Sequence, residues 1–352
     1  MKTFLSLTTL AALLCSLSAF AQTKRYAVVE FSANFMREAP EYEAELGDQS
    51  LMGTVVEIVG EDSYWRKIVS PEPYTAWVND MGLVEMSEEE IRDYIAAPKY
   101  ICTAEYSHVF TSPDLKSQRI SDLVEGNLLR VWNVADRIGS RKISRRIGSG
   151  SGKFLSVLLP SGKTGYVPAS DLEQFDKWAS TRNPSFDNIR STAFRFLGVP
   201  YMWGGTSVKA VDCSGLVRTV WFLNGLLLPR NASQQARIGN EVDFHPDYSI
   251  DEKSPEFQSE MLRRISYLKP GDLLFFGRRA SEGVKERISH VAIYLGEGKY
   301  IHSSEVVRIS SLLPNDRDYS RAFVRARRVL GLQDASKGIV SISKSPYYFP
   351  ER

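Results

Sequence analysis

The sequence predicts an α+β fold in which two small β-barrels precede a domain with helices first and an antiparallel sheet afterwards. The first observation is a repeat, because residues 25–86 and 100–172 show the same succession of short strands separated by Gly, Asp, Ser and Pro. The second is a change from alternating to helical apolar spacing after Trp178, with strand patterns returning only after Pro270. Helices followed by an antiparallel sheet are typical of α+β domains.

The two repeats correspond strand for strand. The matching segments are 55–59 with 127–132, 65–69 with 154–158, 75–79 with 164–168, and the closing leucine strands 81–84 with 170–172. Such a repeat predicts a duplicated β-barrel unit. Between the copies, Ser87–Tyr94 has helical spacing, a serine in the capping position and an acidic first turn, so we expect a connecting helix there.

Residues 1–21 have the features of a signal peptide. A basic residue precedes an apolar run from Leu5 to Leu17 that is too short to span a bilayer, and Ala19-Phe20-Ala21 fits a small-x-small cleavage site. Cys15 could instead mark a lipid anchor, but the large Leu14 before it argues against one. We therefore predict an exported protein, periplasmic or secreted, without stable membrane insertion.

The remaining chain divides into four parts. We expect barrels at 22–95 and 96–176, a third domain at 177–335, and a polar tail without a clear element at 336–352. The net charge of +2, from 44 basic and 42 acidic residues, does not indicate a nucleic-acid partner. The basic run Arg137–Arg146 precedes a Gly-Ser stretch and is predicted to be a solvated hairpin loop, with contact to an anionic polymer as the alternative.

The third domain shows helical patterns before strand patterns. An amphipathic helix is expected over 188–197 and a buried helix over 214–224, each ended by a glycine. Residues 240–266 are polar and acidic-rich, and we interpret them as an insertion. Strands are then expected over Leu273–Phe276, His290–Leu295 and Tyr300–Ser303.

Cys213 is the residue best suited to nucleophilic chemistry. It follows a Gly-rich turn and opens the second helix, where free backbone N–H groups favour a negative charge. We therefore expect the pKa of Cys213 to be lowered, and the neighbouring glycines to keep the backbone open to a substrate. Asp212 is expected to cap the helix or to bind a substrate amine. Cys102, the other cysteine of the mature chain, is predicted to be a reduced core residue rather than a disulfide partner.

His290 and His302 can be placed relative to each other by strand register. If 296–298 is a three-residue hairpin loop, Leu295 lies opposite Lys299, and His302 lies opposite the residue two positions after His290. The two histidines then share one face as diagonal neighbours, roughly 7–8 Å apart at the backbone, which allows a hydrogen bond between their rings. We expect His290 to act as the base and His302 to orient it.

Ordered motifs around these residues resemble the NlpC-type cell-wall peptidases, which are papain-like cysteine hydrolases of bacterial peptidoglycan. The resemblance covers about residues 186–329, and its motifs are Tyr201–Gly205, Asp212–Leu216, Leu228–Gln235, Leu268–Phe276, Ser289–Gly296 and Tyr300–Ser303. The upstream repeats, through Thr75–Asn79 and Thr164–Pro168, resemble bacterial SH3-like domains. Together these resemblances imply a papain-like catalytic domain preceded by two small SH3-like β-barrels.

The family implies hydrolysis of the γ-D-glutamyl-L-diamino acid bond of peptidoglycan stem peptides. Its nucleophile, base and third polar residue fall on Cys213, His290 and His302. Two upstream barrels are similar to the subgroup that acts on free murein peptides with an unblocked N-terminal L-Ala, in cell-wall turnover and recycling. The expected partner is therefore a murein peptide, L-Ala-γ-D-Glu-diamino acid.

The same resemblance implies a set of substrate-binding residues. Glu38 and Tyr74 would hold the ammonium group of the alanine, since a carboxylate and a phenol can bind such a group. The glutamyl side would be lined by Tyr201, Trp203, Asp212 and Ser214, with Ser289 also among the substrate-binding residues. Tyr201 could also donate to the developing oxyanion. The chain has Asn231-Ala232 where the subgroup often has Asp-Ser, which leaves one substrate contact open.

Three other interpretations use the same residues. The chain could be a wall-binding protein with an inactive domain, or an amidase or acyltransferase with the same nucleophile. It could also hold zinc through Cys213, His290 and His302, but the glutamate base and second cysteine pair common in such sites are lacking. We predict no metal and no cofactor. The identity of the diamino acid and the oligomeric state stay open, with a monomer expected.

Overall fold

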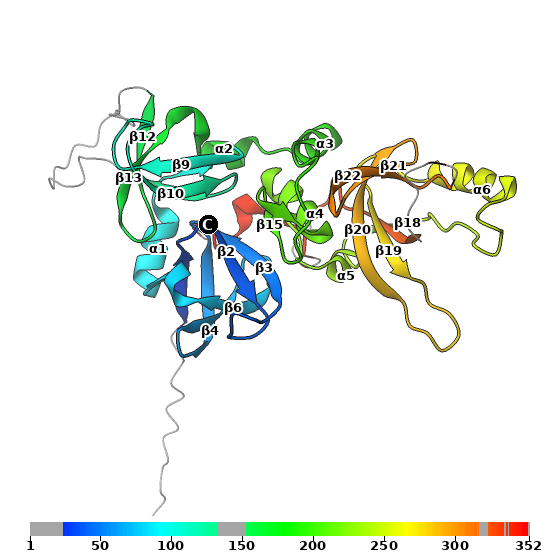
Figure 1. Cartoon of the computed structure of the whole chain (residues 1–352), viewed down its shortest axis with the longest axis horizontal. Coiled ribbons are helices and arrows are strands. Elements are labelled where there is room, and N and C mark those ends of the chain that lie inside the picture. The colour runs from blue at the N-terminus through cyan, green and yellow to red at the C-terminus, as the bar shows by residue number, and fades with distance from the viewer. Residues whose placement is uncertain are drawn as a thin grey trace, which may run out of the picture.

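The computed structural model describes residues 24–132, 153–314, 316, 323–333, 336 and 338–350. The predicted signal peptide 1–21 and the basic run Arg137–Arg146 lie outside these residues. Figure 1 shows two small sheets on one side of the molecule, a central helix α4 (Cys213–Leu223), and a third sheet on the other side. The predicted α+β organisation is confirmed.

The first two sheets are formed by the two sequence repeats. The first sheet contains β1 (Arg25–Val29), β2 (Ala33–Arg37), β3 (Leu46–Leu51), β4 (Val55–Asp62), β5 (Trp65–Val69), β6 (Thr75–Asn79) and β7 (Leu83–Met86). The second contains β8 (Lys99–Cys102), β9 (Tyr106–Phe110), β10 (Arg119–Val124), β11 (Leu128–Val131), β12 (Phe154–Leu158), β13 (Thr164–Pro168) and β14 (Leu172–Gln174).

The two sheets have the same topology. Their strand orders are β3-β2-β6-β5-β4-β1-β7 and β10-β9-β13-β12-β11-β8-β14, which become identical when each strand is replaced by its counterpart in the other repeat. A short 3₁₀ helix precedes the last strand of each sheet, at Asp80–Gly82 and Ala169–Asp171. The predicted duplication is therefore confirmed, while the SH3-like assignment stays a prediction.

Helix α1 (Glu88–Ala96) connects the two sheets, as the sequence predicted. The Ser87 hydroxyl accepts a hydrogen bond from the backbone N–H of Glu90, and the Glu90 carboxylate accepts one from the backbone N–H of Ser87. This reciprocal pair satisfies two N–H groups that would otherwise lack partners. The helix runs two residues further than expected, to Ala96, and Ile91 and Tyr94 bury one face of it against the first sheet.

Helix α2 (Phe175–Thr181) leads into the third part of the molecule, where α3 (Phe186–Arg195) packs against α4. The third sheet has the strand order β18-β23-β19-β20-β21-β22. Its strands are β18 (Asn240–Val242), β23 (Phe323–Arg328), β19 (Leu273–Arg278), β20 (Arg287–Gly296), β21 (Lys299–Ser304) and β22 (Val306–Ser311). Helix α4 is buried along its whole length, as its apolar composition predicted, and it packs against β20 and β21. Shorter elements are β15 (Thr206–Ser207), β16 (Ala210–Val211), β17 (Leu226–Leu227) and α5 (Ala232–Gln235).

The interpretation of residues 240–266 as an insertion was wrong in one respect, because they are part of the sheet and its packing. Strand β18 pairs with β23, and α6 (Pro255–Ile265) covers the face of the sheet that turns away from α4. Phe257 and Met261 form the buried stripe of α6. Only these two residues of α6 are buried, and polar and charged residues surround them, so the local composition concealed the helix.

The C-terminal segment also differs from the expected tail without a clear element. Strand β24 (Val340–Ser341) pairs with β17, and a 3₁₀ turn follows at Ile342–Lys344. The ring of Phe349 then stacks on Phe175 with a centroid separation of 5.0 Å. The segment therefore closes the apolar core around α4, a role set by contacts distant in sequence rather than by its own pattern.

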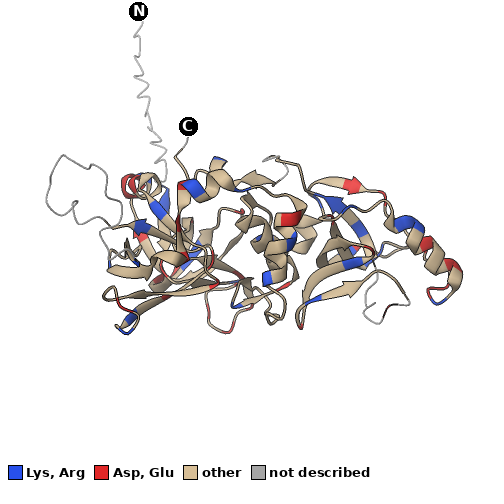
Figure 2. Ribbon diagram, turned by 90° about the horizontal axis from the view of Figure 1, so that it is seen from above, with Lys and Arg blue, Asp and Glu red and all other residues tan. Residues whose placement is uncertain are grey.

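Charged residues of both signs are distributed over the molecule. Figure 2 shows Lys and Arg interspersed with Asp and Glu along the described chain. Among the helices of the described residues, none combines the length and apolar character needed to cross a membrane.

Candidate active site

Cys213 opens helix α4, and Asp212 caps it. The Asp212 carboxylate accepts hydrogen bonds from the backbone N–H of Gly215 at 2.7 Å and of Gly204 at 3.0 Å. This arrangement confirms the predicted cap and fixes the first turn of the helix. The neighbouring glycines act differently from the expectation, because Gly205 and Gly215 are buried against protein backbone rather than open to a substrate. They let the β15–β16 turn approach the helix closely.

The environment of the thiol corrects the expected direction of its pKa. Burial, with a smaller contribution from the charge of Asp212, raises the pKa of Cys213 to about 11. The backbone N–H groups of Val291 and Ser214 and the nearby Arg230 oppose this rise but do not offset it. The helix N-terminus alone suggested a lowered pKa, because sequence does not reveal the burial that removes water from the anion. Burial therefore favours the thiol form of Cys213 in the ligand-free protein.

The two histidines lie on neighbouring strands, His290 on β20 and His302 on β21. The Nε2 atom of His290 and the Nδ1 atom of His302 are 2.7 Å apart, which confirms the predicted hydrogen bond between the rings. Pairing between β20 and β21 begins only at Ile293 and Ile301, so the strands separate where the histidines lie. Because the N–H of Val291 points to Cys213, the thiol lies beside the residue that follows His290.

The predicted strand register was right for the histidines, although the predicted length of the hairpin loop was wrong. Gly296, not Leu295, lies opposite Lys299, and Leu295 forms a bulge. The turn has two residues, Glu297 and Gly298, both with positive φ, as in a type I′ hairpin. The shorter loop and the bulge compensate each other, so the remaining pairs keep the predicted register.

Ser310 completes a chain of hydrogen bonds that sequence reasoning missed. The Nε2 atom of His302 is 2.9 Å from the Ser310 hydroxyl, and both residues are buried. If His302 donates to Ser310, its Nδ1 accepts from His290, and the Nδ1 atom of His290 becomes the acceptor for the thiol proton. The register of β22 on β21, with Ser310 opposite Tyr300, could have located this serine one strand beyond the histidines.

A cleft of about 390 Å³ lies between the first sheet and the third, and Cys213 lines it. The predicted substrate-binding residues all line the same cleft: Glu38, Tyr74, Tyr201, Trp203, Asp212, Ser214 and Ser289. Trp203 is 59% exposed and stands at the surface of the cleft. His290 and His302 are buried, with 4% and 0% exposure, and do not line the cleft, although Ser289 next to His290 does. The cleft thus brings together residues that are up to 251 positions apart, from Glu38 to Ser289.

At the first-sheet side of the cleft, Glu38 and Tyr74 form a pair. The Tyr74 hydroxyl donates a hydrogen bond to the Glu38 carboxylate. Burial and this hydrogen bond raise the pKa of Tyr74, so the phenol stays protonated. Gly47 lies directly beneath the pair, and any side chain there would occupy the space of the carboxylate and the hydroxyl. Gly47 was not singled out from sequence, because a glycine in a strand has no local signature for this role.

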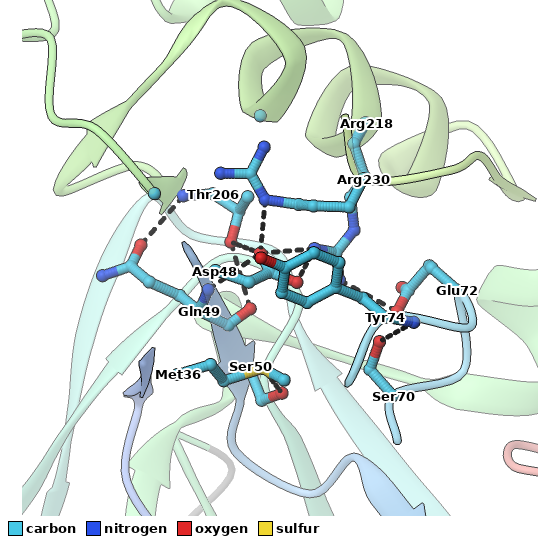
Figure 3. Close-up of polar contacts among 12 residues, drawn as sticks. Met36, Asp48, Gln49, Ser50, Ser70, Glu72, Tyr74, Thr206, Arg218 and Arg230 are labelled. Carbon is cyan, nitrogen blue, oxygen red and sulfur yellow. Dashed lines mark hydrogen bonds and ion pairs between the residues drawn. The ribbon is translucent and has the colours of Figure 1, made fainter. Parts of the chain in front are cut away.

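A buried charge network joins the first sheet to helix α4. Asp48 on β3 is fully buried and binds two arginines, Arg218 Nη1 at 2.5 Å and Arg230 Nε at 2.9 Å (Figure 3). Arg218 also pairs with Glu72 at 2.9 Å. Burial opposes the positive charge of Arg218, but the carboxylates of Asp48 and Glu72 hold the pKa of Arg218 above its usual value. None of these roles was predicted from the sequence, because Asp48 lies 170 and 182 positions from its two arginine partners.

Arg230 extends this network to the two residues that flank the nucleophile. Its Nη2 atom lies 2.5 Å from the Asp212 carboxylate, and its Nη1 atom lies 2.9 Å from the Ser214 hydroxyl. Asp212 and Ser214 flank Cys213, so a chain of buried contacts leads from Asp48 in the first sheet to the residues beside the thiol. Both oxygens of Asp212 already accept from protein donors, which makes this residue a positioning group.

Cys102, by contrast, lies in the core of the second sheet as a free thiol, as predicted. Burial raises its pKa to about 12. Cys213 is also free, so the two cysteines are not joined. Among the residues that the structure describes, no group of three or more His, Cys, Asp and Glu side chains is placed to hold a metal ion.

A thiol that opens a buried helix, beside two bonded histidines on an antiparallel sheet, defines a papain-like cysteine hydrolase. A model of the NlpC/P60 family matches residues 198–328, which span α4 and the histidine strands. The chain belongs to the NlpC/P60 family.

Two relatives match most of the chain. The γ-D-glutamyl-L-lysine dipeptidyl-peptidase of Bacillus cereus is 26% identical over 295 residues, 81% of this chain and 76% of that protein. The dipeptidyl-peptidase 6 of Lysinibacillus sphaericus is 28% identical over 279 residues, 79% of this chain and 86% of that protein. A crystal structure of an NlpC/P60 family protein from Bacillus cereus shares the fold, with a TM-score of 0.64 and 23% identity over 87% of this chain and 99% of that one.

Proposed function

We propose that this protein is a cysteine peptidase that hydrolyses the γ-D-glutamyl-L-diamino acid bond of peptidoglycan stem peptides with a free N-terminal L-Ala. The observation that carries the proposal is a single cleft that has the Cys213 thiol at its base and the Glu38–Tyr74 pair at its first-sheet side. The names of the two relatives support the γ-D-glutamyl linkage and a peptidase that releases dipeptides. The predicted signal peptide, residues 1–21, agrees with an exported enzyme.

The bonded histidines supply the base for this reaction. His290 Nδ1 takes the proton of Cys213, and the sulfur attacks the γ-carbonyl carbon of D-Glu. The imidazolium formed is stabilised by His302, which is itself held by Ser310. Because burial keeps Cys213 protonated in the free protein, we propose that this transfer occurs when a substrate displaces water and brings the carbonyl to the sulfur.

The second half of the reaction releases the products. His290 returns its proton to the diamino-acid nitrogen as the C–N bond breaks, leaving L-Ala-γ-D-Glu as a thioester on Cys213. Water, deprotonated by His290, then attacks the thioester carbon, and the thiol leaves with the proton. The backbone N–H of Cys213 at the helix N-terminus and the Tyr201 hydroxyl are our candidates for donors to the oxyanion of each step.

The first sheet sets the length of peptide on the acyl side of the bond. Glu38 accepts a hydrogen bond from Tyr74 and still offers a negative charge to an ammonium group. An alanine with a free amine can be held there by a charge-assisted hydrogen bond, whereas a blocked amine brings no charge and adds bulk. A substrate that continues beyond L-Ala would meet the first sheet, so the product on this side is a dipeptide.

The decisive experiment is product analysis by mass spectrometry with L-Ala-γ-D-Glu-diaminopimelate as substrate. We expect L-Ala-γ-D-Glu and free diaminopimelate, no cleavage by Cys213→Ala, and an unchanged circular dichroism spectrum for that variant. N-acetylating the alanine should abolish cleavage, and equal turnover of blocked and free peptides would refute the role of Glu38 and Tyr74. Binding of sacculi by a protein that leaves the tripeptide intact would instead favour a wall-binding protein.

A further inference from the structure

The cleft is lined by a positively charged side chain that has no role in the proposed reaction. Two basic residues line the cleft, Arg230 and Arg287. Arg230 is buried and already bound to Asp48 and Asp212, so its charge is compensated within the protein. Arg287, at the start of β20, is exposed, and no ion pair joins it to another residue of the described chain. Its guanidinium is therefore available to a ligand.

The backbone holds Arg287 at the cleft in a defined way. A β-bulge in β20 lies between Ile288 and His290, so Ser289 is the extra residue on that strand. Bulges of this kind re-aim side chains next to functional sites. Here three consecutive residues, Arg287, Ile288 and Ser289, all line the cleft just before the histidine. Gly277 on β19 permits the bulge, because any side chain there would collide with the carbonyl oxygen of Arg287.

The position of Arg287 is electrostatically unfavourable without a ligand. Its cross-strand partner is Arg278, and like charges directly opposite each other destabilise a sheet. The hairpin that they flank projects from the third sheet (Figure 1) and also contains Arg279 and Lys285. Of its two acidic residues, Glu282 and Glu286, the second is already paired with Arg325. An anion at this edge of the cleft would relieve the excess of positive charge.

The two sides of the cleft therefore differ in charge. The first-sheet side has the carboxylates of Glu38 and Glu45, and the β20 side has the guanidinium of Arg287. A murein tripeptide has the matching polarity, because its ammonium terminus is followed by the carboxylates of D-Glu and of the diamino acid. Arginine is suited to such groups, since its planar fork can bind both oxygens of one carboxylate.

We propose that Arg287 is a substrate-binding residue that holds a carboxylate of the peptide, which rests on the proposed function. Three carboxylates of L-Ala-γ-D-Glu-diaminopimelate could supply it: that of D-Glu, the α-carboxylate of the diamino acid, and the distal one that distinguishes diaminopimelate from lysine. The contact orients the peptide across Cys213. If it is the distal carboxylate, Arg287 makes the enzyme selective for diaminopimelate over lysine.

The test compares Arg287→Gln with Arg278→Gln in the full-length protein. Both variants remove one exposed arginine from the same hairpin, but only Arg287 lines the cleft. Four peptides are used: the parent tripeptide and three analogues in which the D-Glu carboxylate is an amide, the diamino-acid α-carboxylate is an amide, or diaminopimelate is replaced by lysine. We expect Arg287→Gln to lower kcat/KM for the parent by about tenfold, the scale of one charge-assisted hydrogen bond.

The loss of kcat/KM should disappear for the one analogue that lacks the carboxylate held by Arg287. That analogue identifies which of the three carboxylates Arg287 binds. A loss of the same size on all four peptides, or an equal loss in Arg278→Gln, would overturn the proposal. Dissociation constants measured by calorimetry in the Cys213→Ala background separate this inference from the proposed function. In one outcome the wild type cleaves no peptide, but Arg287→Gln weakens binding of the parent alone, or of every peptide except one analogue. The proposed reaction is then wrong, and the carboxylate contact stands. Unchanged binding of all four peptides would rule out the contact whatever the reaction.

Discussion

The two N-terminal sheets have one topology but contribute differently to the cleft. Each has a bulge at the same place, opposite the end of its second strand, at Gly47 in the first sheet and Ile120 in the second. This equivalence lets their residues be compared one by one. Where the first sheet has Glu38, Asp48 and Tyr74, the second has Thr111, Ser121 and Lys163. The second sheet therefore lacks the carboxylates and the phenol that the first sheet brings to the cleft and to α4.

The second sheet instead braces the segment that leads to the nucleophile. The Tyr106 hydroxyl donates to the carbonyl of Val208, and Asp122 pairs with Lys209 at 2.6 Å, both in the turn just before Cys213. The two sheets are therefore equal scaffolds, and substitutions at a few matched positions make one of them part of a binding site. The first two predictions below change the first sheet and use the second as the control.

The largest effect is expected for Asp48→Asn in the first sheet. Asp48 is fully buried and neutralises part of both Arg218 and Arg230, so its loss leaves buried positive charge without enough partners. We expect the free energy of unfolding to fall by about 3–5 kcal/mol, measured by urea denaturation. Asp122→Asn removes an exposed pair with Lys209 and should cost less than about 1 kcal/mol. Equal losses in the two variants would contradict a special role of the buried network.

A smaller effect, confined to substrate recognition, is expected for Glu38→Gln. The exposed carboxylate contributes little to folding, but its charge is proposed to hold the ammonium group of the substrate. We expect kcat/KM for the free tripeptide to fall by about 10- to 100-fold, mainly through KM. Thr111→Ala, at the matched position of the second sheet, should leave both constants unchanged. A fall in kcat alone would assign Glu38 to the chemical step instead.

The sequence predicted the parts of this comparison that depend on local pattern. The repeat was visible because Thr75–Asn79 and Thr164–Pro168 share their spacing from neighbouring strands. The capping box of α1 is contained in four residues, from Ser87 to Glu90. The histidine pair followed from alternation along two strands, and it survived a wrong loop length because the Leu295 bulge restored the register.

The features that escaped prediction depend on contacts distant in sequence or on burial. Asp48 meets Arg230 across 182 positions, and no local spacing signals such a pair. Phe349 docks on Phe175 across 174 positions, and the buried stripe of α6 is defined only by its packing against the sheet. The pKa of Cys213 was predicted in the wrong direction, because the helix N-terminus can be recognised in the sequence whereas desolvation cannot.

The last prediction compares the thiol of the cleft with the thiol of the second sheet. Burial raises the pKa of Cys213 to about 11 and that of Cys102 to about 12, both above the ordinary thiol value of 9.0. Alkylation of the free protein by iodoacetamide should therefore accelerate from pH 8 toward pH 10 without a plateau near neutrality. Cys213→Ser should remove almost all of this reactivity, since Cys102 is 0% exposed.

The same shifts set the direction of a pH effect on stability. Both folded pKa values lie above the unfolded one, so the folded state keeps its thiol protons longer, and this contribution is fully present below about pH 9. It is lost as the pH rises from 9 toward 11 and 12. A Cys213→Ser variant should lose less stability over this range than the wild type. A reactive thiolate already formed at pH 7 would mean that the helix N-terminus and the histidines outweigh burial, and that the cleft needs no substrate to activate its sulfur.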